Sequence, residues 1–116
     1  MKPEFWQALL AAELAPARAR KAVDAYRALL LPPDPKDWLL GQPWMSPANR
    51  KRLDEADPAA LARALKRGVQ SRETAGISEA LDAAEASPAL FFRGDIECLG
   101  QPTIGIVGTR AASSYG

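Results

Sequence analysis

A tight turn near the end of the sequence carries the residues best suited to bind a phosphate. Residues 103–107 are nearly all apolar and predict a strand that is buried on both faces. Gly108, Thr109 and Arg110 follow directly, and Ala-Ala-Ser-Ser then begins as a helix would. A glycine turn between a strand and a helix N-terminus can hold a phosphate. A plain turn is the alternative, because the dinucleotide motif G-x-G-x-x-G is absent.

Basic side chains form a second group of candidate binding residues. The whole chain has a net charge of only +1, but residues 18–67 contain eleven basic and six acidic residues, a local net of +5. Cationic clusters bind nucleic-acid phosphates, so two clusters are candidates for auxiliary DNA contact. Solvated helix faces paired with acids such as Asp57, or a protein-docking surface, are the alternatives. The clusters are Arg50, Lys51 and Arg52, and, with helical i, i+3, i+4 spacing, Arg63, Lys66 and Arg67.

The chain contains few of the residue types that commonly act in catalysis or bind metals. No histidine is present, which excludes a histidine-based triad, an imidazole general base and histidine-ligated metal sites within the chain. Cys98 is the single cysteine, so the chain can form neither an internal disulfide nor a multi-thiolate metal site. We therefore expect no catalytic residue, no metal and no cofactor.

The composition predicts a cytoplasmic protein. Apolar residues make up 47% and charged residues 25% of the chain, as in ordinary globular domains. No apolar run reaches the roughly 20 residues that a transmembrane helix needs. Pro3 and Glu4 stand where the apolar run of a signal peptide would begin, and a lone cysteine fits a reducing compartment. We therefore expect no membrane partner.

The first 68 residues have the spacing of a small helical bundle. Pairs of a capping residue and a proline start short helices at 34–35, 46–47 and 57–58, and Pro32-Pro33 ends the helix before them. Trp6, Trp38 and Trp44 would fill the core together with leucines; base stacking is the alternative role for them. The predicted helices span residues 4–14, 16–31, 36–40, 47–56 and 58–67.

The remaining residues predict a second, different unit. Residues 69–88 form a linker with a short helix over 79–86, and residues 89–93 form a strand. Two strands without a covering layer would not be stable alone. The sequence therefore predicts a mainly α chain in which the helical bundle, 1–68, is followed by a linker, 69–88, and by the first strands of a truncated Rossmann-like α/β domain, 89–116.

Two segments of this second unit together resemble the DprA/Smf family of DNA-processing proteins. Pro88–Asp95 (PALFFRGD) is similar to the family pattern P-x-L-F-x-x-G. Ile104–Gly116 (IGIVGTRAASSYG) is similar to the pattern a-I-V-G-[ST]-R-x-a-[ST]-x-Y-G. The Tyr-Pro that usually precedes the first pattern is missing, and Ile77–Leu81 stands there instead.

The resemblance implies a non-enzymatic protein that binds single-stranded DNA. Family members carry a sterile-alpha-motif-like bundle, here residues 1–68, before a Rossmann-like domain that binds the DNA and forms a homodimer. They help to load the recombinase RecA onto incoming strands in natural transformation. By position, Gly108, Thr109 and Arg110 would contact DNA. Because the sequence stops at Gly116, we expect the chain as given to bind single-stranded DNA poorly.

Two other functional interpretations remain open at this point. One is a Rossmann-like nucleotide-binding enzyme of the lysine-decarboxylase-like nucleoside-monophosphate hydrolase group, which also places glycines and an arginine near a phosphate. The other is a generic helix-hairpin-helix DNA-repair module. Leu14–Arg20 lies where such a module has its hairpin and basic helix, although the hairpin glycines are absent.

Overall fold

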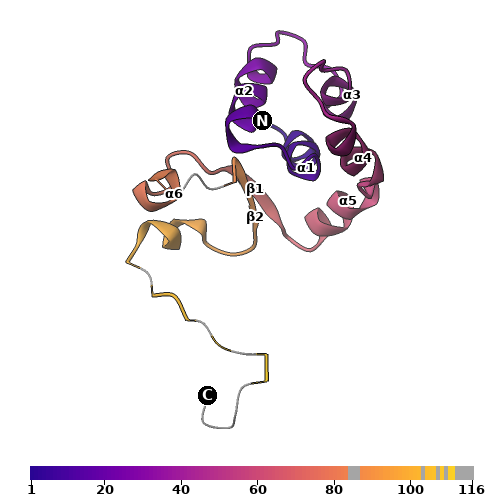
Figure 1. Ribbon diagram of the computed structural model, residues 1–116. Helices are drawn as coiled ribbons and strands as arrows, with labels where there is room; N and C mark the ends of the chain where they lie inside the picture. Colours follow the sequence, from indigo (N-terminus) through magenta and orange to yellow (C-terminus); the bar gives the residue numbers. More distant parts are fainter. Residues whose placement is uncertain (84–86, 103, 107, 109, 112–116) are drawn as a thin grey trace.

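The computed structural model describes residues 1–83, 87–102, 104–106, 108, 110 and 111 (Figure 1). These residues are mainly helical and contain one small antiparallel sheet. None of the described helices has the length and hydropathy needed to span a bilayer. In chain order the elements are α1 (Pro3–Ala11), α2 (Pro16–Arg27), α3 (Pro35–Leu40), α4 (Pro47–Glu55), α5 (Pro58–Lys66), β1 (Gln70–Glu73), α6 (Glu79–Ala83), β2 (Ala89–Phe92) and the 3-10 helix η1 (Ile96–Gly100).

The predicted helix starts are confirmed for α3, α4 and α5. Each of these helices has a proline in its first turn, where the missing N–H would have had no intrahelical acceptor. The residue before each proline caps the helix with its side chain. Asp34 accepts from the amide of Asp37 at 3.1 Å. Ser46 and Asp57 make equivalent bonds, at 3.1 and 2.9 Å.

Helix α2 ends earlier than the sequence predicts. It stops at Arg27 instead of continuing through residue 31. The apolar spacing of the predicted helix places Leu29 and Leu30 on its buried face with Tyr26, and this prediction is wrong. Pro32 disfavours helical backbone at the residue before it. The hydroxyl of Tyr26 also donates to the carbonyl of Pro33 at 2.7 Å, which holds the returning chain against the end of the helix. Leu29, Leu30 and Leu31 are 37%, 97% and 92% exposed.

Helix α1 also ends before its predicted limit at residue 14. Its last helical residue is Ala11, and the amide of Ala12 closes the final turn on the carbonyl of Ala8 at 3.1 Å. Glu13 then adopts φ 51°, the left-handed conformation that terminates a helix. A glutamate gives no sequence signal for that conformation, which glycine usually supplies.

The core of the bundle is an aromatic cluster. Phe5 and Trp6 of α1 are 0% and 2% exposed. Phe5 stacks on Tyr26 of α2 with ring centroids 4.4 Å apart, and Trp6 meets Phe5 edge-on at 5.3 Å. Trp38 of α3 extends the cluster by an edge contact with Tyr26 at 5.1 Å. The predicted core position of Trp6 is confirmed, and Trp38 and Trp44 pack against the core while remaining half-buried.

Strand β1 forms within the segment that the sequence predicts to be a linker. It pairs antiparallel with β2, with Gln70 opposite Phe92 and Glu73 opposite Ala89. The sequence of β1, QSRE, lacks the apolar alternation that signals a strand, so pairing with the predicted strand β2 decides its conformation. Ala89 enters the core of the bundle and is 1% exposed. Arg27 of α2 bridges to Glu73 at 2.6 Å, so the two-stranded sheet packs directly against the helices (Figure 1).

The strand predicted over 103–107 is not found where the structure describes it. Ile104, Gly105 and Ile106 lie in neither a helix nor a strand, and the two isoleucines are 91% and 93% exposed. A strand buried on both faces needs a hydrogen-bonded neighbour and two covering layers. Among the described residues no strand pairs with 104–106. Thr103 and Val107 lie outside the described residues, as do residues 84–86 of the predicted helix 79–86.

Candidate nucleic-acid interface

The predicted phosphate-binding turn is exposed where the structure describes it. Gly108 and Arg110 are both exposed, whereas Thr109 lies outside the described residues. Arg110 forms no ion pair with another described residue. Its guanidinium is permanently charged and presents a planar fork of N–H donors. The side chain is therefore available to an anionic group in solution.

Arg50 of the first basic cluster is turned toward the protein itself. Its guanidinium donates to the carbonyls of Leu40, of Gln42 at 2.9 Å and of Met45 at 3.3 Å. These three acceptors all lie between the last residue of α3 and the start of α4. Arg50 therefore braces the α3–α4 connection, and each of its three guanidinium nitrogens already donates to a backbone carbonyl.

The other members of the first cluster point into solvent and carry weak ion pairs. Lys51 lies 3.9 Å from Glu55 one turn along α4, and Arg52 lies 3.2 Å from Glu13 at the end of α1. At least half of each side chain is exposed in both pairs. Such pairs contribute about 0–1 kcal/mol, so a phosphate could replace either carboxylate at little cost.

In the second cluster, Arg63 forms an ion pair, whereas Lys66 and Arg67 face solvent. Arg63 donates to the carboxylate of Asp57 at 2.6 Å, which confirms the predicted alternative for this arginine. That hydrogen bond, and then the one from the amide of Ala59, lowers the pKa of Asp57 below its ordinary value. Lys66 and Arg67 are exposed at the C-terminal end of α5 and form no ion pair with a described residue. Cations at this end of a helix also complement its dipole.

An arginine outside both clusters makes a contact that the sequence did not predict. The guanidinium of Arg18 in α2 lies over the ring of Trp44 in the α3–α4 connection, 5.2 Å from its centroid. Cation–π pairs of this kind are worth about 0.5–1 kcal/mol at exposed sites. No spacing rule links two residues in different elements, so only the fold shows the pair. Trp44 is half-buried, as is Trp38.

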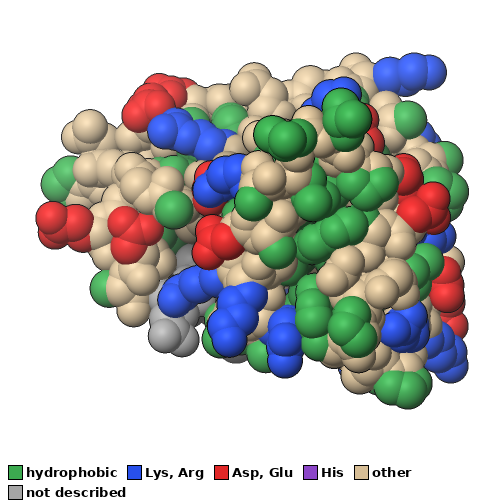
Figure 2. All heavy atoms as spheres, turned by 90° about the horizontal axis from the view of Figure 1, so that it is seen from above, with side chains coloured by type: hydrophobic (Ala, Val, Ile, Leu, Met, Phe, Trp, Pro, Cys, Tyr) green, Lys and Arg blue, Asp and Glu red, His purple; other side chains and the backbone are tan. Residues whose placement is uncertain are grey.

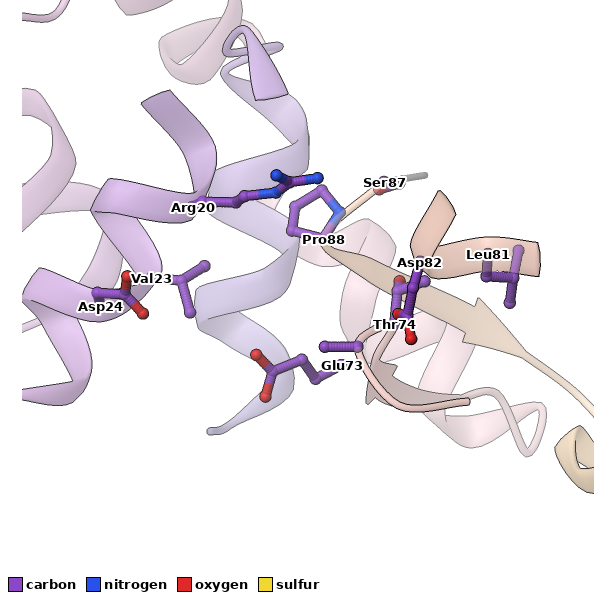
Figure 3. Close-up of a pocket in the computed structure, with 10 residues that line it drawn as sticks. Arg20, Val23, Asp24, Glu73, Thr74, Leu81, Asp82, Ser87 and Pro88 are labelled. Atoms are coloured by element: carbon purple, nitrogen blue, oxygen red, sulfur yellow. The ribbon is translucent and has the colours of Figure 1, made fainter. Parts of the chain in front are cut away.

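A cleft of about 360 Å³ lies between α2 and the segment that joins β1, α6 and β2 (Figure 3). Arg20 reaches over it from α2 toward Pro88, but the acids Asp24, Glu73 and Asp82 also line it. This excess of carboxylates disfavours a phosphate. Within the described parts of the chain, no group of three or more His, Cys, Asp or Glu residues is arranged to hold a metal ion.

Comparison with known families identifies one segment of the chain. Residues 71–116 match the family described as DNA recombination-mediator protein A. The matched segment includes α6, β2, η1 and the exposed turn that contains Gly108 and Arg110, whereas helices α1–α5 lie before it. Neither a curated protein nor a solved structure matches the chain.

Proposed function

We propose that the chain, whose residues 71–116 match the DNA recombination-mediator protein A (DprA) family, is a member of that family and binds single-stranded DNA through the turn Gly108-Thr109-Arg110. A role in DNA processing during recombination follows from the family itself. The observation that carries the finer proposal is the position of the turn: it lies inside the matched segment, and its described residues are exposed. In this proposal, Arg110 donates to a phosphate or base and Gly108 allows the strand to approach the backbone.

The proposal extends to the partners that the family resemblance implies. The complete protein forms a homodimer through a Rossmann-like domain, which begins at about residue 89, and helps to load RecA onto single strands that enter the cytoplasm in natural transformation. The helical residues 1–68 form the sterile-alpha-motif-like domain. No catalysis is part of this role. The nucleotide-hydrolase alternative has less support, because the family match is to a recombination mediator.

Auxiliary DNA contact by the helical bundle is assigned to the basic residues that face solvent. Lys66 and Arg67 have no competing ion pair among the described residues. Lys51, Arg52 and Arg63 hold exposed carboxylates that a phosphate could replace. Arg50 is left out of this group, because its guanidinium already donates to three backbone carbonyls of the α3–α4 connection.

Substitution of Arg110 tests the assigned contact. In the complete protein, Arg110→Ala should weaken binding to a single-stranded oligonucleotide by roughly 1–3 kcal/mol, the value of one lost charge-assisted contact. That loss equals about a 5- to 150-fold rise in Kd, measured by fluorescence anisotropy with a labelled oligonucleotide.

A matched control separates this contact from a general loss of positive charge. Arg93 is also an exposed arginine, one residue after β2, and lies outside the proposed turn. Arg93→Ala should therefore leave Kd within about twofold of the wild-type value, a charge effect screened by salt. Equal Kd values for Arg110→Ala and wild type would contradict the residue assignment. Failure of the wild-type protein to bind would contradict the proposed function.

A further inference from the structure

A tryptophan and an arginine meet at the surface of the helical bundle, where the first turns of α2 face the α3–α4 connection. The guanidinium of Arg18 lies over the ring of Trp44, 5.2 Å from its centroid. The Trp44 side chain packs against the core and is half-buried, whereas Arg18 is exposed. Arg18 forms no ion pair with another described residue. An exposed side chain that holds no carboxylate thus covers the indole.

The connection that carries Trp44 is fixed by hydrogen bonds. Arg50 of α4 donates to three carbonyls of this connection, which lie on both sides of Trp44 in the sequence; they belong to Leu40, Gln42 and Met45. Met45, the next residue after Trp44, is 5% exposed and belongs to the core. Because the ring is already held in place, a ligand that stacks on it loses little free energy to ordering of the loop.

The two segments that meet at this pair are basic. Residues 14–23 and residues 38–53 each contain three basic residues and neither Asp nor Glu. The acids that flank the first segment face other groups: Glu13 pairs with Arg52 at 3.2 Å, and Asp24 lines the cleft beside α6. Figure 2 shows Lys and Arg side chains gathered along the lower edge of the face that it views. The surface around the pair therefore favours an anionic ligand.

Arg18 and Lys21 are the cations best placed to meet such a ligand. They lie three residues apart on α2 and are therefore neighbours on the surface of that helix. Lys21 is exposed and, like Arg18, forms no ion pair within the described part of the chain. Lys51 and Arg52 of α4, in contrast, already hold carboxylates. An aromatic ring and two available cations thus lie together.

We propose that Trp44 stacks with a base of single-stranded DNA, while Arg18 and Lys21 bind the phosphates beside that base. A base on an aromatic ring is held more strongly than an exposed guanidinium, so the base takes the place of Arg18 on the indole. Arg18, displaced from the ring, then lies beside the same nucleotide and donates to its phosphate. Stacking accepts every base but requires an unpaired one, so the ligand is a single strand bound without sequence preference.

This stacking site is separate from the turn at Gly108. It lies in the helical bundle, outside the segment 71–116 that matches the recombination-mediator family. The identity of its ligand rests on the proposed function, whereas its chemistry rests on Trp44, Arg18 and Lys21. An acidic peptide would engage the two cations and leave the indole without a stacking partner, but a nucleotide engages all three side chains.

Two substitutions of Trp44 test the stacking contact in the complete protein. Trp44→Leu keeps an apolar side chain against the core and removes the aromatic face, whereas Trp44→Phe keeps a smaller aromatic face. Trp44→Leu should raise the Kd for a labelled oligothymidylate by about 5- to 150-fold, the value of one stacked base, and Trp44→Phe should raise it less. Fluorescence anisotropy measures each Kd.

An abasic oligonucleotide of the same length separates stacking from a loss of structure. It keeps the phosphates and lacks the bases, so Trp44→Leu should change its Kd by less than about twofold. Arg18→Ala should weaken the binding of both oligonucleotides, because it removes a phosphate contact. Arg20→Ala is the matched control for charge: Arg20 lies on the same helix but reaches over the acidic cleft (Figure 3), so its loss should leave Kd within about twofold of the wild-type value.

The outcomes distinguish this contact from the proposed function. An unchanged Kd in Trp44→Leu, or an equal rise for the normal and the abasic oligonucleotide, overturns the stacking site; the proposed function stands if Arg110→Ala still weakens binding. A wild-type protein that binds no single strand overturns both. Circular dichroism must show wild-type helicity in Trp44→Leu. If it does not, ultraviolet cross-linking of the wild type to a bromouracil oligonucleotide replaces the variant, and a cross-link that mass spectrometry maps elsewhere than Trp44 overturns the site.

Discussion

Replacement of Trp6 by alanine is expected to lower the free energy of unfolding by about 3–5 kcal/mol, the range for truncation of a buried aromatic residue. Trp6 is 2% exposed and meets Phe5 edge-on, and Phe5 in turn stacks on Tyr26. Removal of the indole leaves a cavity beneath α1 and takes away one end of the aromatic cluster. Urea denaturation, followed by circular dichroism, measures the change.

An exposed leucine provides the control for this effect. Leu30→Ala removes an apolar side chain that is 97% exposed in the monomer, so the free energy of unfolding should change by less than about 0.5 kcal/mol. If Trp6→Ala does not fold, Trp6→Phe should show a smaller loss in the same direction. A Trp6→Ala protein as stable as the wild type would contradict the aromatic core of the bundle.

Replacement of Arg50 by alanine should also destabilise the bundle, by roughly 1.5–3 kcal/mol, as for lost hydrogen bonds from a charged donor. The carbonyls of Leu40, Gln42 and Met45 would lose a shared donor. Arg50→Lys should recover only part of the loss, because an ammonium cannot reproduce the planar fork of a guanidinium. Thermal unfolding of the three proteins at equal concentration gives the comparison.

The neighbouring lysine separates this role from the charge of the cluster. Lys51 carries the same charge one residue along α4, but its single ion pair with Glu55 is long and exposed. Lys51→Ala should therefore cost no more than about 0.5 kcal/mol. Equal losses for Arg50→Ala and Lys51→Ala would show that Arg50 acts through its charge and not as a brace.

The helical part of the fold could be predicted from local signals. The cap and proline pairs at Asp34, Ser46 and Asp57 act within one helical turn, so the sequence shows them directly. The ends of α1 and α2 were harder to predict from the sequence. The end of α2 depends on a hydrogen bond from Tyr26 to Pro33, and the end of α1 on a left-handed glutamate at Glu13, neither of which has a periodic signal.

The sheet, in contrast to the helices, could be predicted only in part, because its formation depends on pairing between distant residues. Strand β2 is apolar and was predicted, but β1 is polar and forms only through pairing with β2, a contact between distant residues. The run at Ile104 and Ile106 has the composition of a buried strand yet is exposed, because composition alone does not supply a neighbour.

The candidate DNA-binding residues are predicted from composition and from the family resemblance. The structure then shows which of these side chains face solvent and which contact the protein itself. Arg50 and Lys51 are equivalent in sequence, but only the fold shows that one binds backbone carbonyls and the other points into solvent. The assignment of Arg110 to DNA rests on the family match and on its exposure, and remains a proposal. The Arg18–Trp44 pair, like the pairing of β1 with β2, joins residues that are distant in the sequence, so no local pattern predicts it.

The most direct test of the proposed function is the affinity of the complete protein for a single-stranded oligonucleotide, compared with the same sequence as a duplex. Fluorescence anisotropy should show tighter binding to the single strand, and the affinity should fall as salt rises because phosphate contacts release counterions. No binding to the single strand at low salt, or equal affinity for strand and duplex, would contradict the assignment of the chain as a single-strand DNA-binding recombination mediator.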